Sequence, residues 1–409
     1  MELAAADGPA EVLTCVREQA RERALQLVLD TIQRWLYLPD TGPVLITLAA
    51  VAANLLSGDP VWLLIVAPPG SGKTELLQSL ASLPNVHPAG TLTEASLLSG
   101  SPGRERAKDA NGGLLCSVGR FGIVVLKDFT SILSMNREQR GPLLAALREI
   151  HDGDWTRHIG VDGGRCLNWS GKCALIGGCT PSIDRHHGIM SSMGERFLFY
   201  RLPEVNADEL AERALSHSGH QKVMRQELTE TVSKFFEVLS IPQAPPDLVP
   251  AEREFLVRLS TLIVRCRSAV ERDGYNREIE LIPDAESPGR LASTLAQLLA
   301  GLKVIGSGPG DCHRLLLKTG LDCVPALRRR LIEVLAFKGA PALSTVLAEH
   351  VGHPTVTAVR RALEDLAGHG ITRRTSAGNG KADLWELSEW AQMAYRAVNQ
   401  AFPKSQEGL

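Results

Sequence analysis

The chain has 409 residues, of which 44% are hydrophobic and 22% charged, and its formal net charge is −2. A chain of this length predicts two or three domains, and the near-neutral charge excludes a molecule that is basic throughout. The eight cysteines form no C-x-x-C pair, which argues against a zinc site and a disulfide framework. No signal-peptide pattern opens the chain and no apolar run is long enough for a membrane span, so we expect a cytoplasmic protein without membrane contact.

The first half of the chain alternates apolar runs of strand length with helical patterns. In chain order we predict helices at 9–37 and 44–56, a strand at 61–66, a helix at 74–82, a strand at 122–126, a helix at 137–151 and a strand at 173–177. Continuous apolar runs are typical of parallel strands that are covered on both faces. The pattern therefore predicts an α/β domain with a parallel sheet.

After this region the pattern becomes helical. The predicted helices are 208–215, 221–239, 251–273 and 289–301, with a proline-rich linker at 241–250 and a loop at 306–311.

A phosphate-binding loop is predicted directly after the strand at 61–66. The run Ala67-Pro-Pro-Gly-Ser-Gly-Lys-Thr74 has P-loop spacing, with alanine where glycine is commoner in first position. Its backbone N–H groups would cradle the β-phosphate, Lys73 would reach the β- and γ-phosphates, and Thr74 would hold Mg²⁺. The expected ATP-binding residues are Pro69, Gly70, Ser71, Gly72, Lys73, Thr74 and Glu75.

The strand at 122–126 is followed by Lys127, Asp128 and Phe129. Nucleotide motors usually carry two acids at this point, one for Mg²⁺ and one to polarise water. If the strand stops at Leu126, Lys127 takes the metal-side position and Asp128 the water-side position. If Asp128 is instead the metal ligand, Phe129 takes the water-side position. We prefer the first register, because a lysine inside a buried strand would be costly.

In either register one carboxylate is missing, which leaves the hydrolysis rate open. Glu149 and Asp152 are candidate substitutes.

The C-terminal region has nine lysine or arginine residues and only four acids between positions 324 and 381. Helices at 327–337, 343–350 and 355–367, followed by a two-stranded hairpin over 370–387, give the element order of a winged helix. In that geometry the third helix enters the major groove of DNA. The candidate DNA contacts are His353, Thr355 and Thr357 for the groove, and Arg360, Arg361, Arg373, Arg374 and Lys381 for phosphates. The alternative is a winged helix that contacts protein.

Together these motifs resemble the AAA+ superfamily, and within it the clade with a β-hairpin inserted before sensor 1. Minichromosome-maintenance helicases and sigma-54 activators belong to this clade. The resemblance covers roughly 61–202 and one helix near Arg290. It implies an ATPase with an α/β P-loop core and an α-helical lid.

The resemblance also implies roles for residues beyond the P-loop. The run 143–160 resembles the helix and strand that lead into the inserted hairpin, and 161–169 resembles the hairpin itself. Arg157, His158 and Arg165 are then candidate DNA contacts, although they could equally be ordinary surface residues of a hairpin.

Sensor 1 would be Thr180, which contacts the γ-phosphate or the attacking water, and its alternative role is to cap a turn. Arg196 would be the arginine finger that reaches the γ-phosphate of a neighbouring subunit, with Arg201 as the alternative. Arg290 would be sensor 2 at a phosphate. A finger that acts in trans implies a homo-oligomeric ring, with six subunits as the expected number.

The expected domains are an N-terminal helical segment at 1–40, the P-loop core at 41–203, a helical lid region at 204–305 and a winged-helix domain at 320–395. The leading hypothesis is an oligomeric ATPase that binds or remodels DNA, as a replication or recombination factor with a helicase-like role does. A second hypothesis is a transcriptional regulator in which ATP acts as a slow switch, and a third is a protein-remodelling adaptor.

Overall fold

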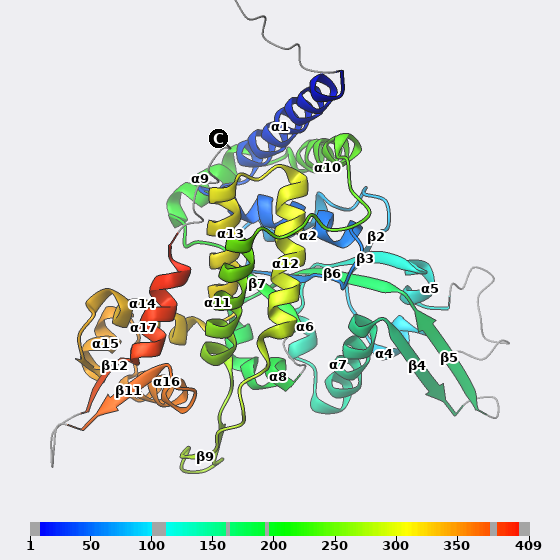
Figure 1. The fold of residues 1–409 in the computed structure, drawn as a ribbon. Coiled ribbons are helices and arrows are strands. Elements are labelled where there is room, and N and C mark those ends of the chain that lie inside the picture. Colours follow the sequence, from blue (N-terminus) through cyan, green and yellow to red (C-terminus); the bar gives the residue numbers. More distant parts are fainter. Residues whose placement is uncertain (1–8, 100–111, 161–163, 193–195, 377–382, 401–409) are drawn as a thin grey trace, which may run out of the picture. The chain divides into compact units, whose positions relative to one another are not determined.

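The computed structural model describes residues 9–99, 112–160, 164–192, 196–376 and 383–400 (Figure 1). The chain divides into two compact units, which we call the sheet unit and the helical unit. The sheet unit comprises Met1–Thr180, Leu202–Pro246 and Gln297–Gly308. The helical unit comprises Pro181–Arg201, Asp247–Ala296 and Pro309–Leu409.

A five-stranded sheet has the order β2-β3-β6-β1-β7. Its strands are β1 (Trp62–Val66), β2 (Val86–Ala89), β3 (Phe121–Leu126), β6 (Lys172–Cys179) and β7 (Phe197–Arg201). The pairs β2–β3, β3–β6 and β6–β1 are parallel. Every residue of β1 is buried, as the continuous apolar run requires when both faces of a strand are covered. The predicted α/β class with a parallel sheet is therefore confirmed, and each predicted apolar run forms a strand.

The sheet unit also contains nine helices within the described residues. These are α1 (Pro9–Trp35), α2 (Gly42–Leu55), α3 (Lys73–Gln78), α4 (Glu94–Leu97), α5 (Leu114–Val118), α6 (Thr130–Leu133), α7 (Arg137–Asp152), α9 (Ala207–Ser216) and α10 (Gln221–Val238).

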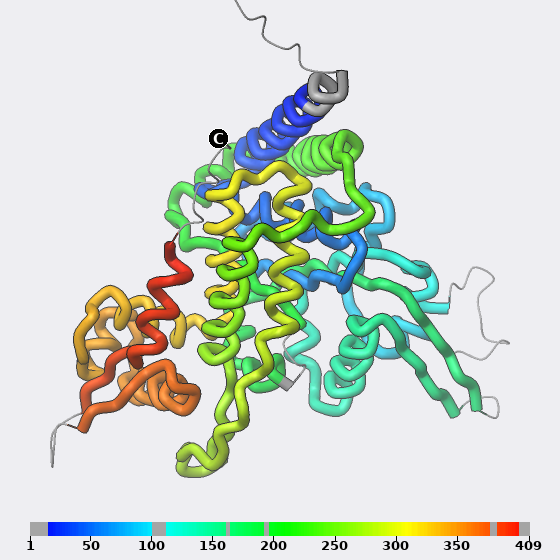
Figure 2. The backbone as a smooth tube through the Cα atoms, viewed as in Figure 1, coloured from blue at the N-terminus to red at the C-terminus, as the bar shows by residue number. Residues whose placement is uncertain are grey.

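The N-terminal helix α1 lies beside α10 (Figure 2). Arg34 forms an ion pair with Glu227 of α10, and the indole Nε1 of Trp35 donates to the same carboxylate at 2.8 Å. The inner face of α1 is apolar, with Val28 and Ile32 almost fully buried. The helix α1 thus packs as part of the sheet unit.

An antiparallel hairpin extends away from the sheet between α7 and β6 (Figure 1). It consists of β4 (Asp154–Ile159) and β5 (Arg165–Ser170), and Trp155 faces Trp169 across the strands. Both indoles are 7% exposed, so this cross-strand pair stabilises the base of the hairpin. The residues 161–163 between the strands lie outside the described part of the chain.

The helical unit begins with the short helix η2 (Pro181–His186) and α8 (His187–Ser192), and then β7. It continues with α11 (Pro250–Arg267), β8 (Glu271–Arg272), β9 (Ile279–Leu281), the first part of α12 (Pro288–Ile305) and α13 (Pro309–Asp322).

Two of the differences from the predicted elements concern α11 and α13. The helix predicted at 251–273 ends at Arg267, because the chain then turns into the β8–β9 hairpin. The predicted elements miss α13, whose glycine at position 320 lowers helix propensity. In the structure Gly320 packs against Leu259, where a Cβ would lie only 3.1 Å from the leucine side chain. Close packing therefore compensates for the weak local preference.

The C-terminal module of the helical unit combines helices with a small antiparallel sheet of order β10-β12-β11. Its elements are α14 (Ala326–Lys338), β10 (Ala342–Leu343), α15 (Ser344–His350), α16 (Val356–Gly368), β11 (Thr372–Thr375), β12 (Leu384–Leu387) and α17 (Glu389–Val398). Leu347, Val359, Leu363 and Leu366 are fully buried and form its core. Across the described part of the whole chain, no helix combines the length and apolarity that crossing a membrane requires.

Candidate nucleotide-binding site

The loop between β1 and α3 has the backbone conformation that its glycines allow. Gly70 and Gly72 adopt φ angles of 80° and 81°, a left-handed region that side chains with a Cβ rarely occupy. Lys73 starts α3 and is only 8% exposed, and its Nζ donates to the Pro68 carbonyl at 2.9 Å. The loop therefore folds back over its own lysine. Burial lowers the pKa of the Lys73 ammonium, and the negative charge of Asp128 opposes this shift.

Polar side chains from the ends of β3 and β6 lie together beside this loop. Thr130 connects them, because its Oγ1 lies 3.2 Å from the hydroxyl of Thr180 and accepts from the Thr180 N–H at 2.9 Å. The Thr130 N–H donates in turn to Asp128 Oδ1 at 2.9 Å. Parallel strands present their carboxyl ends at one edge of a sheet, where α/β proteins commonly bind ligands. The structure thus brings Asp128 and Thr180 together and adds Thr130, a residue that the sequence patterns do not single out.

The end of β3 determines which register applies to the residues that follow it. The strand ends at Leu126, and Lys127 and Asp128 are exposed whereas Phe129 is fully buried. This arrangement agrees with the register in which Lys127 takes the metal-side position. A side chain as buried as Phe129 cannot take the water-side position.

Glu149 and Asp152 lie on the last turns of α7. Between them, His151 packs edge-on against Trp62, with ring centroids 5.0 Å apart. Trp62 is the first residue of β1, whereas the P-loop follows the last, about 16 Å further along an extended strand. This contact places the end of α7 beside the start of β1, and the role of Glu149 and Asp152 as substitutes stays a prediction.

The oxygen donors foreseen for Mg²⁺ are the Thr74 hydroxyl and the Asp128 carboxylate. Mg²⁺ requires octahedral oxygen coordination, usually with one or two carboxylates beside phosphate and water. The nearby Glu75 is bound by Arg225, whose guanidinium donates to both carboxylate oxygens at 2.7 and 2.9 Å. In the described ranges, no three acidic, histidine or cysteine side chains are grouped to hold a metal ion. Thr74 and Asp128 supply one hydroxyl and one carboxylate, fewer ligands than a site built from protein alone needs, so their binding of Mg²⁺ together with phosphate stays a prediction.

Two cavities adjoin the P-loop within the sheet unit. The first has a volume of about 200 Å³ and lies against the three loop residues from Gly70 to Gly72. Its other walls are Trp35, Leu36, Tyr37, Leu210, Arg213, Ala214, His217, Gln221 and Met224. The rings of Trp35 and His217 lie 4.8 Å apart within this wall. Residues next to the N-terminal helix therefore line the site, and no sequence motif indicates them.

The second cavity has a volume of about 330 Å³ and is lined by Ser71, Pro68 and Pro69 on the loop side. Tyr37, Asp40 and other residues of the segments 37–43 and 202–210 complete it. The Ser71 Oγ is buried and has no hydrogen-bond partner among the described residues. It is thus a polar atom available to a ligand in these cavities.

The three arginines implied by the AAA+ resemblance all belong to the helical unit. Arg196 is 6% exposed and immediately precedes β7, so its side chain lies inside the unit in this state. Arg290 is exposed in the first turn of α12 and forms an ion pair with Glu286 at 3.5 Å.

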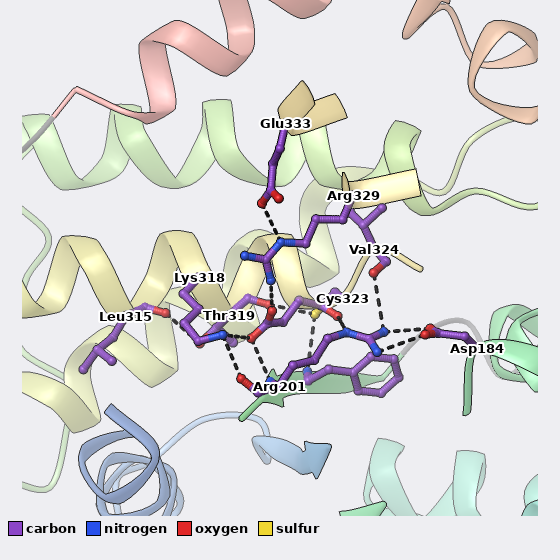
Figure 3. Close-up of polar contacts among 11 residues, drawn as sticks. Asp184, Arg201, Leu315, Lys318, Thr319, Cys323, Val324, Arg329 and Glu333 are labelled. Carbon is purple, nitrogen blue, oxygen red and sulfur yellow. Dashed lines mark hydrogen bonds and ion pairs between the residues drawn. The ribbon is translucent and has the colours of Figure 1, made fainter. Parts of the chain in front are cut away.

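Arg201 is held in a polar cluster (Figure 3). Its guanidinium donates to both oxygens of Asp184, at 3.0 and 2.7 Å, and to the backbone carbonyl of Asp322 at 3.0 Å. A bidentate arginine–carboxylate pair has a fixed geometry. Arg201 is therefore held by Asp184 and Asp322 in this structure, and its role as the alternative arginine finger stays a prediction.

The hairpin residues differ in how they are held. Arg157 is 15% exposed, and it donates to Glu94 at 2.9 Å and also to the Leu98 carbonyl. The Arg157 guanidinium is therefore already bound by residues of the sheet unit. His158 is exposed and Arg165 is half-buried.

Two of the candidate DNA contacts of the C-terminal module, Thr355 and Thr357, are exposed at the start of α16. The Thr355 N–H donates to Nδ1 of the half-buried His353 at 3.1 Å. Arg361, further along α16, is half-buried. Three arginines are partly neutralised by ion pairs, Arg360 with Glu364, Arg373 with Glu386 and Arg374 with Asp383. Lys381 lies outside the described residues.

Part of the positive charge of this module is not on its surface. Arg328 is 6% exposed and donates to Asp365 at 2.8 Å, and Arg329 is paired with Asp322 and Glu333. The local excess of basic residues in the sequence therefore overstates the charge that a partner would meet.

No protein-family model and no curated protein matches this chain. Among solved structures it is similar to a full-length MCM homologue from Methanopyrus kandleri, with 14% identity and a TM-score of 0.39. The match covers 89% of this chain and 63% of that chain, so the chain spans less than two thirds of the homologue. It is also similar to two apo structures of the NrS-1 C-terminal region, with 14% and 11% identity and TM-scores of 0.25 and 0.24. Both matches cover 89% of this chain and 75% of the other. TM-scores this low transfer no function to the chain.

Proposed function

We propose that the chain is an ATP-binding protein and an ATPase, and that its P-loop holds the phosphates. The observation that carries this proposal is the position of Lys73 beside Asp128 and Thr180, at the carboxyl edge of a parallel sheet. Lys73 supplies a cation for the β- and γ-phosphates, and Thr180 supplies a hydroxyl for the γ-phosphate or the attacking water. Asp128, with Oδ1 held by Thr130, accepts a proton or orients water through its second oxygen.

The adenosine half of the nucleotide is proposed to enter the cavity between the P-loop and Trp35. This cavity touches Gly70 and Gly72, and its wall carries an aromatic ring and a histidine ring on which a base can stack. The buried Ser71 Oγ offers a hydrogen bond on the same side.

The direct test is titration of ATP into the full chain by calorimetry, with steady-state turnover measured in parallel. We expect Lys73→Ala to weaken ATP binding by at least about tenfold and to abolish turnover, because it removes the charge-assisted contact to the phosphates. Lys222→Ala, an exposed lysine on α10, is the matched control and should behave as wild type. Unchanged ATP affinity in Lys73→Ala would show that this loop is not the phosphate site.

DNA binding is proposed for the C-terminal module, as a winged helix. Support comes from the order α14-β10-α15-α16-β11-β12 and from the exposed start of α16 with Thr355 and Thr357. Together with the P-loop, this makes the chain an ATPase that binds or remodels DNA in a helicase-like role.

A homo-oligomeric ring is proposed on the resemblance alone, with Arg196 acting on the neighbouring subunit. Since Arg196 is buried here, this role requires its side chain to be exposed on assembly.

An ATP-switched transcriptional regulator is the second candidate. It is favoured by the single acid at the end of β3, because one carboxylate fewer predicts slow hydrolysis. Competition between random and enriched duplex DNA separates the two functions. Strong sequence preference with negligible turnover supports the regulator, and DNA-stimulated turnover supports the motor.

A further inference from the structure

We infer that Lys127 acts in place of the missing metal-side carboxylate. Its ammonium contacts the terminal phosphates of the bound nucleotide, so that ATP binding depends only weakly on Mg²⁺. This inference rests on the proposed ATP site. It concerns which positive groups of that site neutralise the negative charge of the triphosphate.

The backbone at Lys127 is fixed to the sheet. The Phe129 N–H donates to the Gly178 carbonyl at 2.7 Å, and a Cβ on Gly178 would come within 2.6 Å of the Lys127 carbonyl oxygen. Such close approach is available only to glycine. The end of β3 is therefore held against β6, and Lys127 leaves the sheet at a defined point.

The side chain of Lys127 is directed towards α3. With the Gln78 amide in its hydrogen-bonding orientation, Lys127 Nζ donates to the amide oxygen at 2.8 Å. The amide nitrogen donates to Glu75 at 3.2 Å. Gln78 follows Thr74 by four residues in α3, and side chains at this spacing lie on one face of a helix. The Lys127 ammonium thus lies on the face of α3 that carries the Thr74 hydroxyl.

The charges around Lys127 favour an anion over a divalent cation. Its hydrogen-bond partner is a neutral amide, while the adjacent Glu75 carboxylate is held by Arg225. Lys73, the first residue of α3, supplies the ammonium of the P-loop, and the charge of Asp128 acts on this ammonium. Two ammonium groups repel Mg²⁺ and attract the triphosphate, and opposite charges a few ångströms apart interact strongly where water is partly excluded.

The test is ATP titration into the full chain in excess EDTA and again in millimolar Mg²⁺. The variants are wild type, Lys127→Asp and Lys127→Met, with Lys222→Met as the control for loss of an exposed lysine. In the wild type we expect the Kd to differ by less than about threefold between the two media. Lys127→Met should weaken ATP binding in EDTA by about tenfold, and Lys127→Asp should make binding tighten by at least about tenfold when Mg²⁺ is added. Because Lys127 is exposed, both variants should keep the wild-type melting temperature.

Equal Mg²⁺ dependence of the wild type and Lys127→Asp would overturn the inference while leaving the ATP site intact. Wild-type binding that Lys127→Met leaves unchanged in EDTA would also overturn it. A wild type that binds no ATP in either medium would overturn the proposed function together with this inference.

Discussion

Arg201 and Asp322 illustrate how burial assigns a role to a charged residue. From its place in the sequence, Arg201 is the alternative to Arg196 as the candidate arginine finger. In the structure the Asp322 carboxylate is fully buried and accepts from the Arg201 N–H and from Lys318 Nζ, each at 2.8 Å, and it is also paired with Arg329. Burial raises the pKa of Asp322, although both neighbouring cations act to lower it. A carboxylate without water depends on such donors, so this cluster stabilises the helical unit.

We therefore expect Asp322→Ala to destabilise the helical unit by about 3–5 kcal/mol, because Lys318 and Arg329 lose their buried partner. The corresponding fall in melting temperature is at least several degrees, measured by calorimetry on the full chain. Asp311→Ala is the control on the same helix, since Asp311 pairs with the partly exposed Arg314. In the Asp322→Ala/Arg329→Met double variant, the loss of unfolding free energy should be smaller than the sum of the losses in the two single variants. Additive losses would mean that the two side chains are not coupled.

At the scale of elements, one side of α16 packs into the core of its module, and its first turn is the proposed DNA contact. Its buried side carries Val359 and Leu363, and its later turns carry Asp365, which accepts from Arg272 at 2.7 Å and from Arg328 at 2.8 Å. Its first turn is exposed and bears no acid. The proposed DNA-binding surface is thus limited to the start of the helix, because ion pairs fix its later part.

Thr357→Glu places a negative charge at this exposed first turn. We expect it to weaken binding of duplex DNA to the full chain by about tenfold at low salt, through repulsion of the phosphates. Fluorescence anisotropy across a salt series measures this effect. Gln226→Glu, an exposed position on α10, makes the same change in net charge as a control. Equal DNA binding by both variants, or none by the wild type at any salt concentration, would exclude α16 as the contact.

For the whole molecule, the main finding is that residues distant in the sequence combine around the P-loop. The end of α1 supplies Trp35, the residue after α9 is His217, and α10 supplies Met224 to the same cavity. A segment predicted only as an N-terminal helix is therefore part of the candidate site. The proposed ring also belongs to this scale, because a neighbouring subunit would contribute Arg196 to the ATP site.

A mixing experiment tests that contribution. Lys73→Ala and Arg196→Ala should each abolish ATP turnover when measured alone. If a finger acts between subunits, an equal mixture should regain activity in about one quarter of its sites, because intact P-loops then meet intact fingers in a head-to-tail ring. Lys73→Ala mixed with the Lys73→Ala/Arg196→Ala double variant is the inactive control. Since Arg196 is buried, Arg196→Lys and a melting curve check that lost activity does not reflect unfolding. Absence of recovery between two folded variants would rule out the trans-acting finger.

Local patterns were sufficient for three strands of the sheet and for the loop between β1 and α3. The strands β1 and β3 are apolar along their whole length, and β6 is apolar after Lys172, as expected for strands that are covered on both faces. The glycines before Lys73 allow a backbone with positive φ. The magnesium ligands Thr74 and Asp128 and the substitute acids Glu149 and Asp152 stay predictions, because residue type alone does not give distance.

The sequence by itself determined the α/β class, the P-loop and the incomplete acidic pair after β3, because these depend on periodicity and on contiguous residues. Tertiary structure alone decided that Thr130 links Asp128 to Thr180, that Lys127 turns towards Gln78, and that Trp35 lines a cavity beside Gly70. These contacts join residues from separate elements, and their geometry depends on strand order and packing, which no local pattern encodes.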